Sequence, residues 1–188
     1  GVSVDKENAD GLTPLYVAVS RGQPLIMAQL INLGANVTSV STKGDNILHV
    51  AAVKSHYHLL SAVFTQLWDK GVIDEDFIDA PNKRGNTPLH LVCSPVHSTA
   101  TEEESIEFAK WLLDRGADPN KRNINLMTPL YAASLHGMTK IAEYLVNRGA
   151  YVDLCDHNRI TPFWIACREG SLETASMLRR KGAAVDKE

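Results

Sequence analysis

The chain has 188 residues, of which 44% are hydrophobic and 22% charged, and this composition predicts a folded domain rather than a low-complexity segment. A net charge of -3 gives no overall basic field for direct nucleic-acid binding, and no apolar run approaches the ~20 residues that span a bilayer, so we expect no membrane insertion. Three sparse cysteines suggest no disulfide framework, and we therefore expect a reducing compartment, either cytoplasmic or nuclear.

Five similar strings recur along the chain, each followed by an apolar segment and a glycine. The strings start at Thr13, Asn46, Thr87, Thr128 and Thr161, which are 33, 41, 41 and 33 residues apart. The sequence VDKE occurs at residues 4–7 and again at 185–188, so both ends lie at the same phase of the repeat. We expect one domain over residues 1–188, as a fragment of a longer chain. Residues 1–7 would end a preceding repeat, and five repeats would follow at about 8–40, 41–81, 82–122, 123–155 and 156–188.

Each copy of the repeat predicts two helices. The threonine that opens a string supplies a hydroxyl to cap the first free N–H groups, and the following proline suits the first helical position. Small residues such as Ala51, Ala52, Ala132 and Ala133 come next and allow neighbouring helices to approach closely. A second segment has apolar residues at helical spacing, and the glycine after it suits a left-handed helix end.

The string TPLH at residues 87–90 and the closing LLDRGAD at residues 112–118 resemble the ankyrin repeat family. The resemblance covers essentially the whole chain. It implies an all-α repeat solenoid, an ankyrin stack of antiparallel helix pairs joined by β-hairpin-like loops. It also implies a non-catalytic module that presents a concave groove of hairpin tips and first helices to a partner protein.

The second copy is eight residues longer than the 33-residue unit. Four extra residues lengthen its second helix, whose apolar stripe runs from Leu59 to Trp68, and we expect this turn of ~6 Å to project beyond its neighbours. Four more lengthen the loop from Val72 to Asp79, and we expect this loop to fold back over the aromatic residues of the helix.

The third copy has its eight extra residues between Cys93 and Phe108, which places them at the turn joining its two helices. Thr101 and Glu104 match a capping box that opens the second helix. The same acidic stretch could also direct phosphorylation of a threonine, but capping is the simpler interpretation.

The resemblance places partner-binding residues at the hairpin tips and on the first helices. The middle of this row is basic and the later tips are apolar, which favours a protein partner with acidic and apolar residues. An ordinary solvated face is the alternative explanation of the basic residues. The predicted partner-binding residues are Lys43, Lys54, Lys83, Arg84, Ile124, Met127, Leu135, His136, Ile160 and Arg168.

Other groups of polar residues in the sequence can be explained by structural roles. Leu112, Asp118 and Asn120 resemble the pattern that cytosolic asparaginyl hydroxylases modify, with Pro119 in place of the usual aliphatic residue. The alternative is that the Asn120 side chain only braces the hairpin through local hydrogen bonds. His49 and His90 occupy the histidine position of the repeat. No zinc spacing or catalytic motif is present, so we expect no metal site, cofactor, small-molecule substrate or enzyme activity. The alternative function is a regulatory segment of a larger enzyme or channel that docks on its own chain.

Overall fold

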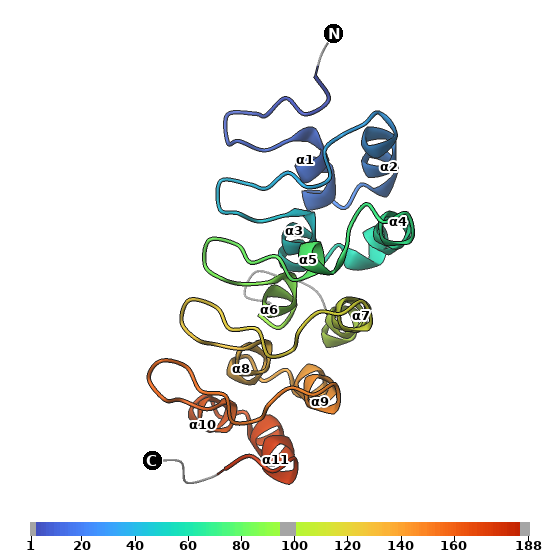
Figure 1. The fold of residues 1–188 in the computed structure, drawn as a ribbon. Helices are drawn as coiled ribbons and strands as arrows, with labels where there is room; N and C mark the ends of the chain where they lie inside the picture. Colours follow the sequence, from blue (N-terminus) through green and yellow to red (C-terminus); the bar gives the residue numbers. More distant parts are fainter. Residues whose placement is uncertain (1–2, 95–100, 185–188) are drawn as a thin grey trace.

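A computed structural model describes residues 3–94 and 101–184, and these residues form eleven helices and no strand (Figure 1). The inner helices follow the five recurring strings: α1 (Pro14–Ser20), α3 (Ile47–Lys54), α6 (Pro88–Val92), α8 (Pro129–Leu135) and α10 (Pro162–Arg168). The outer helices alternate with them: α2 (Pro24–Asn32), α4 (Tyr57–Asp69), α7 (Glu102–Asp114), α9 (Thr139–Asn147) and α11 (Leu172–Arg180). A short helix, α5 (Glu75–Ile78), lies in the loop after α4.

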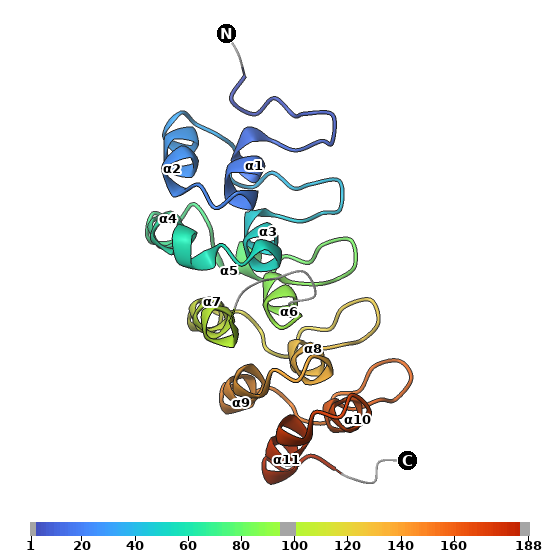
Figure 2. The same cartoon turned by 180° about the vertical axis from the view of Figure 1, so that it is seen from behind.

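These elements are stacked in three columns (Figure 1, Figure 2). Hairpin loops form one edge, inner helices lie in the middle, and outer helices form the opposite edge. Each inner helix packs against the outer helix of its own copy and against the inner helix of each adjacent copy. The predicted all-α repeat solenoid is therefore confirmed. Within the described part of the chain, no helix is both long enough and apolar enough to cross a membrane.

The inner helices begin where the sequence predicts. The hydroxyl oxygens of Thr13, Thr128 and Thr161 accept hydrogen bonds from the backbone N–H three residues later, at 3.2, 3.1 and 3.2 Å. A proline at the first helical position follows each of these threonines. Asn46 replaces the threonine in the second copy and accepts from two backbone N–H groups instead. Local capping therefore fixes where each inner helix begins, and with it the phase of the stack.

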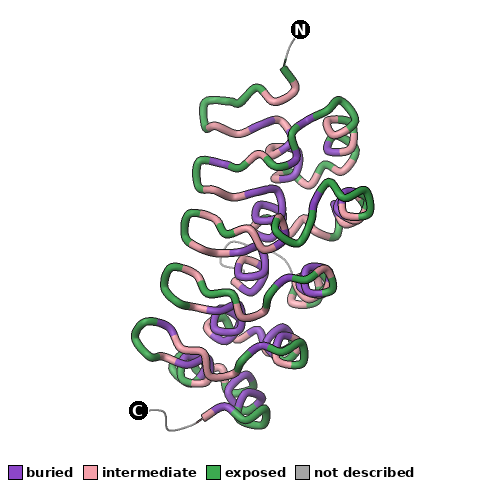
Figure 3. The backbone as a smooth tube through the Cα atoms, in the orientation of Figure 1, coloured by how far each residue is buried: buried purple, intermediate pink, exposed green. Residues whose placement is uncertain are grey.

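The hydrophobic core is a continuous seam between the two helix columns. Figure 3 shows buried segments along both columns, whereas the hairpin edge is largely exposed. Leu15, Leu48, Leu89 and Leu130 hold the same position in four successive copies, and each is fully buried. Burying one leucine side chain contributes roughly 1.5–3 kcal/mol, so this column of leucines is a main source of cohesion between copies.

Helices α4 and α7 are both 13 residues long, whereas α2, α9 and α11 have 9 residues each. The predicted lengthening of α4 is confirmed, but α4 does not project beyond α7. Tyr57 on α4 stacks on Phe108 of α7, with ring centroids 4.3 Å apart. Phe64 is fully buried, and the Arg115 guanidinium lies 5.7 Å from the ring centroid of half-buried Trp68. The two long helices, α4 and α7, therefore meet in one aromatic cluster.

The loop after α4 folds back onto the core, and its predicted contact with the aromatic residues of α4 stays a prediction. Ile73 and Ile78 are buried, and half-buried Phe77 packs against the core cluster. Asp74 caps α5, because its carboxylate accepts a hydrogen bond of 2.9 Å from the backbone N–H of Phe77. The lengthened loop thus contains a short helix, α5, beside α3 (Figure 1), where the Asn46 side chain donates to the Phe77 carbonyl at 3.1 Å.

The insertion of the third copy differs from its prediction. The sequence predicts all eight extra residues at the turn between the two helices, but residues 102–105 form the first turn of α7. Residues 95–100 lie outside the described residues. The capping box is confirmed, because the Thr101 hydroxyl accepts from the N–H of Glu104 at 3.3 Å and the Glu104 carboxylate accepts from the N–H of Thr101 at 3.0 Å.

Candidate protein-binding surface

Five hairpin tips form the exposed edge of the stack. Each tip is closed by a backbone hydrogen bond of 2.9 to 3.1 Å between its first N–H and its last carbonyl. The first to fifth tips are residues 8–12, 41–45, 82–86, 123–127 and 156–160. Further backbone bonds join the second tip to the third, the third to the fourth and the fourth to the fifth, at 3.0, 3.1 and 3.3 Å. Four tips are thus held in one fixed row, which lowers the cost of ordering them on binding.

The predicted basic residues lie on this row or beside it. Lys43, Lys83 and Arg84 are exposed on the second and third tips, and Lys54 is exposed at the end of α3. Within residues 3–94 and 101–184, no carboxylate forms an ion pair with any of these four. Their charges are therefore available to a ligand.

The predicted apolar tip residues separate into two groups. Ile124 is 67% exposed and its neighbour Leu126 is 40% exposed, both on the fourth tip. Met127 and Ile160 are half-buried at the ends of their tips. The fourth tip therefore provides most of the apolar surface on the row.

The inner helices add residues next to the fourth and fifth tips. Leu135 is half-buried at the end of α8, and the imidazole Nε2 of exposed His136 lies 2.9 Å from the Ser94 hydroxyl. Arg168 on α10 is exposed and forms an ion pair of 2.9 Å with Glu169.

Sequence reasoning missed Trp164, which is 50% exposed and lies under the Arg168 guanidinium at 5.4 Å from the ring centroid. Trp164 holds the position that His49, His90 and Tyr131 hold in earlier copies. The tryptophan at this position of the repeat could have indicated a binding residue, because tryptophans are enriched among the residues that dominate binding energy at protein interfaces.

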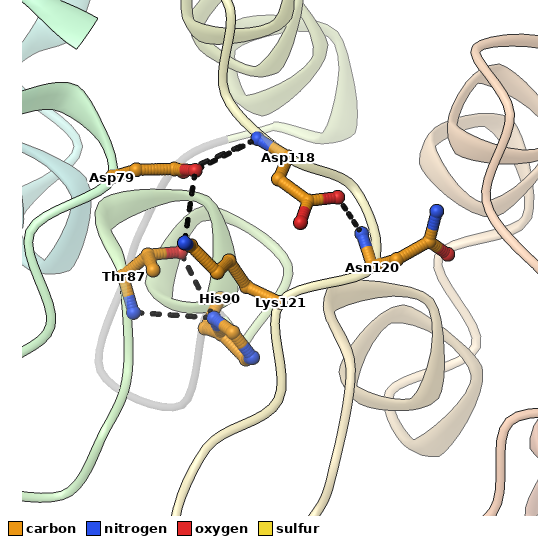
Figure 4. Close-up of polar contacts among 6 residues, drawn as sticks. All are labelled: Asp79, Thr87, His90, Asp118, Asn120 and Lys121. Carbon is orange, nitrogen blue, oxygen red and sulfur yellow. Dashed lines mark hydrogen bonds and ion pairs between the residues drawn. The ribbon is translucent and has the colours of Figure 1, made fainter. Parts of the chain in front are cut away.

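The buried histidines connect successive copies. In Figure 4, His90 lies beside Thr87, whose backbone N–H donates to His90 Nδ1 at 3.1 Å. The opposite nitrogen, Nε2, lies 3.1 Å from the Met127 carbonyl, so it carries the proton and donates. Burial lowers the pKa of His90 to about 4, which keeps the ring neutral near pH 7. His49 makes the equivalent contact with the Asn86 carbonyl at 2.9 Å, so the predicted structural role of both histidines is confirmed.

A second set of polar contacts joins copies at the glycine end of the outer helices (Figure 4). The backbone N–H of Asp118 donates to both carboxylate oxygens of Asp79, at 3.2 and 3.1 Å, and Lys121 lies 3.8 Å from the same carboxylate. The Asn120 side chain donates to the Gly149 carbonyl at 3.0 Å and accepts from the Tyr151 N–H at 2.8 Å. Asn120 therefore braces the next copy, and its hydroxylation stays a prediction.

Comparisons with known proteins agree with this architecture. A family model described as ankyrin repeats (3 copies) matches residues 33–123 and 96–188, and a single ankyrin repeat model matches residues 10–42. The chain is 40% identical to NF-kappa-B inhibitor delta of Mus musculus over 87 residues, which are 46% of this chain and 25% of that protein. It is 28% identical to the nuclear factor NF-kappa-B p105 subunit of Gallus gallus over 159 residues, covering 69% of this chain and 15% of that protein.

A third relative is the human transient receptor potential cation channel subfamily A member 1. The chain is 51% identical to this channel over 49 residues, which are 26% of this chain and 4% of the channel. The chain thus spans a quarter or less of the length of these curated relatives.

Proposed function

The chain belongs to the ankyrin repeat family and is a protein-interaction module, and we propose that it binds its partner through the hairpin tips and the adjoining inner helices. The binding residues in this proposal are the ten predicted from the sequence, together with Leu126 and Trp164. The observation that carries it is the linked row of tips, on which Lys43, Lys83 and Arg84 form no ion pair within the described residues and lie in the same row as exposed apolar side chains.

Charged and apolar side chains should contribute to binding at this surface in different ways. Exposed cations each add little affinity, but they accelerate association with an acidic partner. Apolar and aromatic side chains that lose water at the centre of an interface each contribute more than about 1 kcal/mol and slow dissociation. Because the first two relatives carry NF-kappa-B in their names, NF-kappa-B proteins are the first partners to test.

The test is a kinetic binding measurement on purified proteins. Reversal of Lys83 and Arg84 to glutamate should slow association and weaken its dependence on salt. The matched control is Lys70→Glu, which reverses an exposed charge at the end of α4 on the outer column. Unchanged association of the Lys83 and Arg84 variant, together with loss of binding in Lys70→Glu, would move the binding surface to the outer helices.

The proposal assigns no reaction to this chain and places its function in the cytoplasm or nucleus. The sequence supports both points, because it has no recognisable catalytic motif and its cysteines are free: Cys93 is buried, Cys155 is half-buried and Cys167 is exposed. A thiol-reactive probe applied to the protein in its native source would test the compartment. Extensive oxidation of Cys167 there would contradict it.

The second candidate function is regulation within a larger polypeptide, and the match to a cation channel favours it. In that case the same tips would dock on another part of the same chain. Adding this segment in trans to the full-length protein with its own repeats deleted would restore regulation. Binding to a separate protein with no effect on the parent chain would exclude this candidate.

A further inference from the structure

Two hairpin tips contain backbone conformations that their residue types disfavour. The first three tips place glycine in the left-handed region, with φ of 70° at Gly11, 78° at Gly44 and 72° at Gly85. The fourth and fifth tips place Leu126 and Arg159 there instead, with φ of 61° and 64°. A residue with a Cβ atom pays roughly 1–2 kcal/mol for this conformation, and a leucine at positive φ is uncommon.

The surrounding structure imposes this conformation on Leu126. The Arg122 guanidinium donates to the Leu126 carbonyl at 3.1 Å and to the Cys155 carbonyl at 2.6 Å. The Asn123 side-chain oxygen accepts from the N–H groups of the residues on either side of Leu126, at 2.9 and 3.0 Å. Backbone bonds to the third and fifth tips complete the restraint. These hydrogen bonds involve only main-chain atoms of the tip and the side chains of Arg122 and Asn123, so a glycine at position 126 would keep all of them.

The hydrogen bonds that shape the fourth tip therefore do not require a leucine side chain at position 126. Its side chain is 40% exposed, and its neighbour Ile124 is 67% exposed, so the fourth tip displays two apolar side chains to solvent. Strained residues that the structure holds in place are concentrated at binding sites, where a fixed geometry is useful to a ligand. The position of Leu126 fits this pattern.

The charges around the fourth tip indicate what the ligand is. The third tip carries exposed Lys83 and Arg84, and the fifth tip carries exposed Arg159. The nearby acidic side chains already accept hydrogen bonds within the row of tips: Asp45 of the second tip accepts from the Asn82 side chain, and Asp156 of the fifth tip accepts from two N–H groups of its own tip. An apolar pair is thus flanked on both sides by basic residues.

We propose that the fourth tip is the centre of the partner-binding surface, and that it takes an extended acidic segment of the partner with one large apolar side chain placed against Ile124 and Leu126. The carboxylates of that segment lie on the third and fifth tips. This inference rests on the proposed function, because it names where on the row the partner is recognised and by which chemistry.

The experiment selects short random peptides displayed on phage against the immobilised chain. We expect the selected peptides to contain a large apolar residue between acidic residues. Leu126→Gly and Leu126→Asn should each lower their affinity about tenfold or more. Both variants should also raise the melting temperature by about 2–4 °C, because glycine and asparagine adopt positive φ at lower cost. Leu25→Ser is the matched control, since it removes a 79% exposed leucine from α2, and it should leave peptide binding unchanged.

Three results would overturn the inference. Selected peptides without the acidic and apolar combination, or no enrichment at all, would reject the chemistry. Unchanged peptide affinity in both Leu126 variants would reject the location. A lower melting temperature in both variants would show that the leucine serves folding. If the Lys83 and Arg84 reversal weakens binding of a partner while the Leu126 variants do not, the proposed function stands and only this inference fails.

Discussion

Replacing Phe108 with alanine should allow the first two copies to unfold separately from the last three. Phe108 is 2% exposed on α7, and its ring lies 4.3 Å from Tyr57, 6.4 Å from Phe64 and 6.2 Å from Trp111 between centroids. Truncating a buried phenylalanine to alanine costs about 3–5 kcal/mol through lost burial and the cavity that remains. Each aromatic pair adds about 0.5–1.5 kcal/mol beyond burial, so we expect the upper part of that range.

The loss is localised because a repeat protein is held together by contacts between neighbouring copies. Tyr57 and Phe64 belong to α4, so Phe108→Ala weakens the α4–α7 interface specifically. Urea unfolding followed by circular dichroism should then show two transitions in place of one. Tyr151→Ala provides the matched control, because Tyr151 is 66% exposed, and it should change the unfolding free energy by less than about 0.5 kcal/mol.

A double-mutant cycle between Tyr57 and Phe108 tests the stacking itself. Because the two rings are stacked at an interplanar angle of 6°, we expect a coupling energy of about 0.5–1.5 kcal/mol. A single transition in Phe108→Ala with a loss below about 1 kcal/mol would refute the reasoning, since it would mean that the α4–α7 cluster contributes little to cohesion. A coupling energy near zero would refute the stacking contribution alone.

Two further predictions concern pH and capping. The pKa of His90 is about 4 in the folded protein, against an ordinary 6.5 in the unfolded chain. Between these two pH values the unfolded chain binds a proton more readily than the folded protein does. The stability that neutral His90 contributes should therefore be fully present above pH 6.5 and be lost as the pH falls towards 4. Protonation of His90 should lower the free energy of unfolding by an amount that approaches ~3 kcal/mol. In urea titrations at several pH values, the free energy of unfolding should fall less steeply with pH for His90→Gln, but not for the exposed tip variant His157→Gln. The Glu102 carboxylate accepts from two backbone N–H groups in the first turn of α9, at 2.8 and 3.3 Å, and α9 has no side-chain cap of its own. Glu102→Ala should therefore cost about 0.5–2 kcal/mol in thermal or urea unfolding, whereas equal stability of Glu102→Ala and the exposed control Glu107→Ala would contradict this capping role.

The sequence by itself determined the repeat, the helix pairs and the phase of the stack. Thr13, Thr128 and Thr161 cap helices through hydrogen bonds within three residues, so their effect is local and can be read from a short string. Because each copy packs mainly against its neighbours, a correct local pattern repeated along the chain is enough to specify the overall solenoid. The basic row of Lys43, Lys83 and Arg84 was predictable for the same reason, because the tips occur at fixed offsets from the helix starts.

The tertiary structure alone decided what the insertions and the later tips do. Residues 102–105 extend α7, and the Glu102 carboxylate caps a helix that begins 37 residues later in the chain. The meeting of Tyr57 with Phe108 likewise depends on how two long helices lie against each other. Leu126 shows a left-handed backbone without the glycine that would have signalled it, because hydrogen bonds from Arg122 and Asn123 impose the conformation. The roles of Glu102 and Phe108 thus depend on contacts between residues distant in sequence, whereas Leu126 is restrained by Arg122 and Asn123 close by in the chain and by the neighbouring tips.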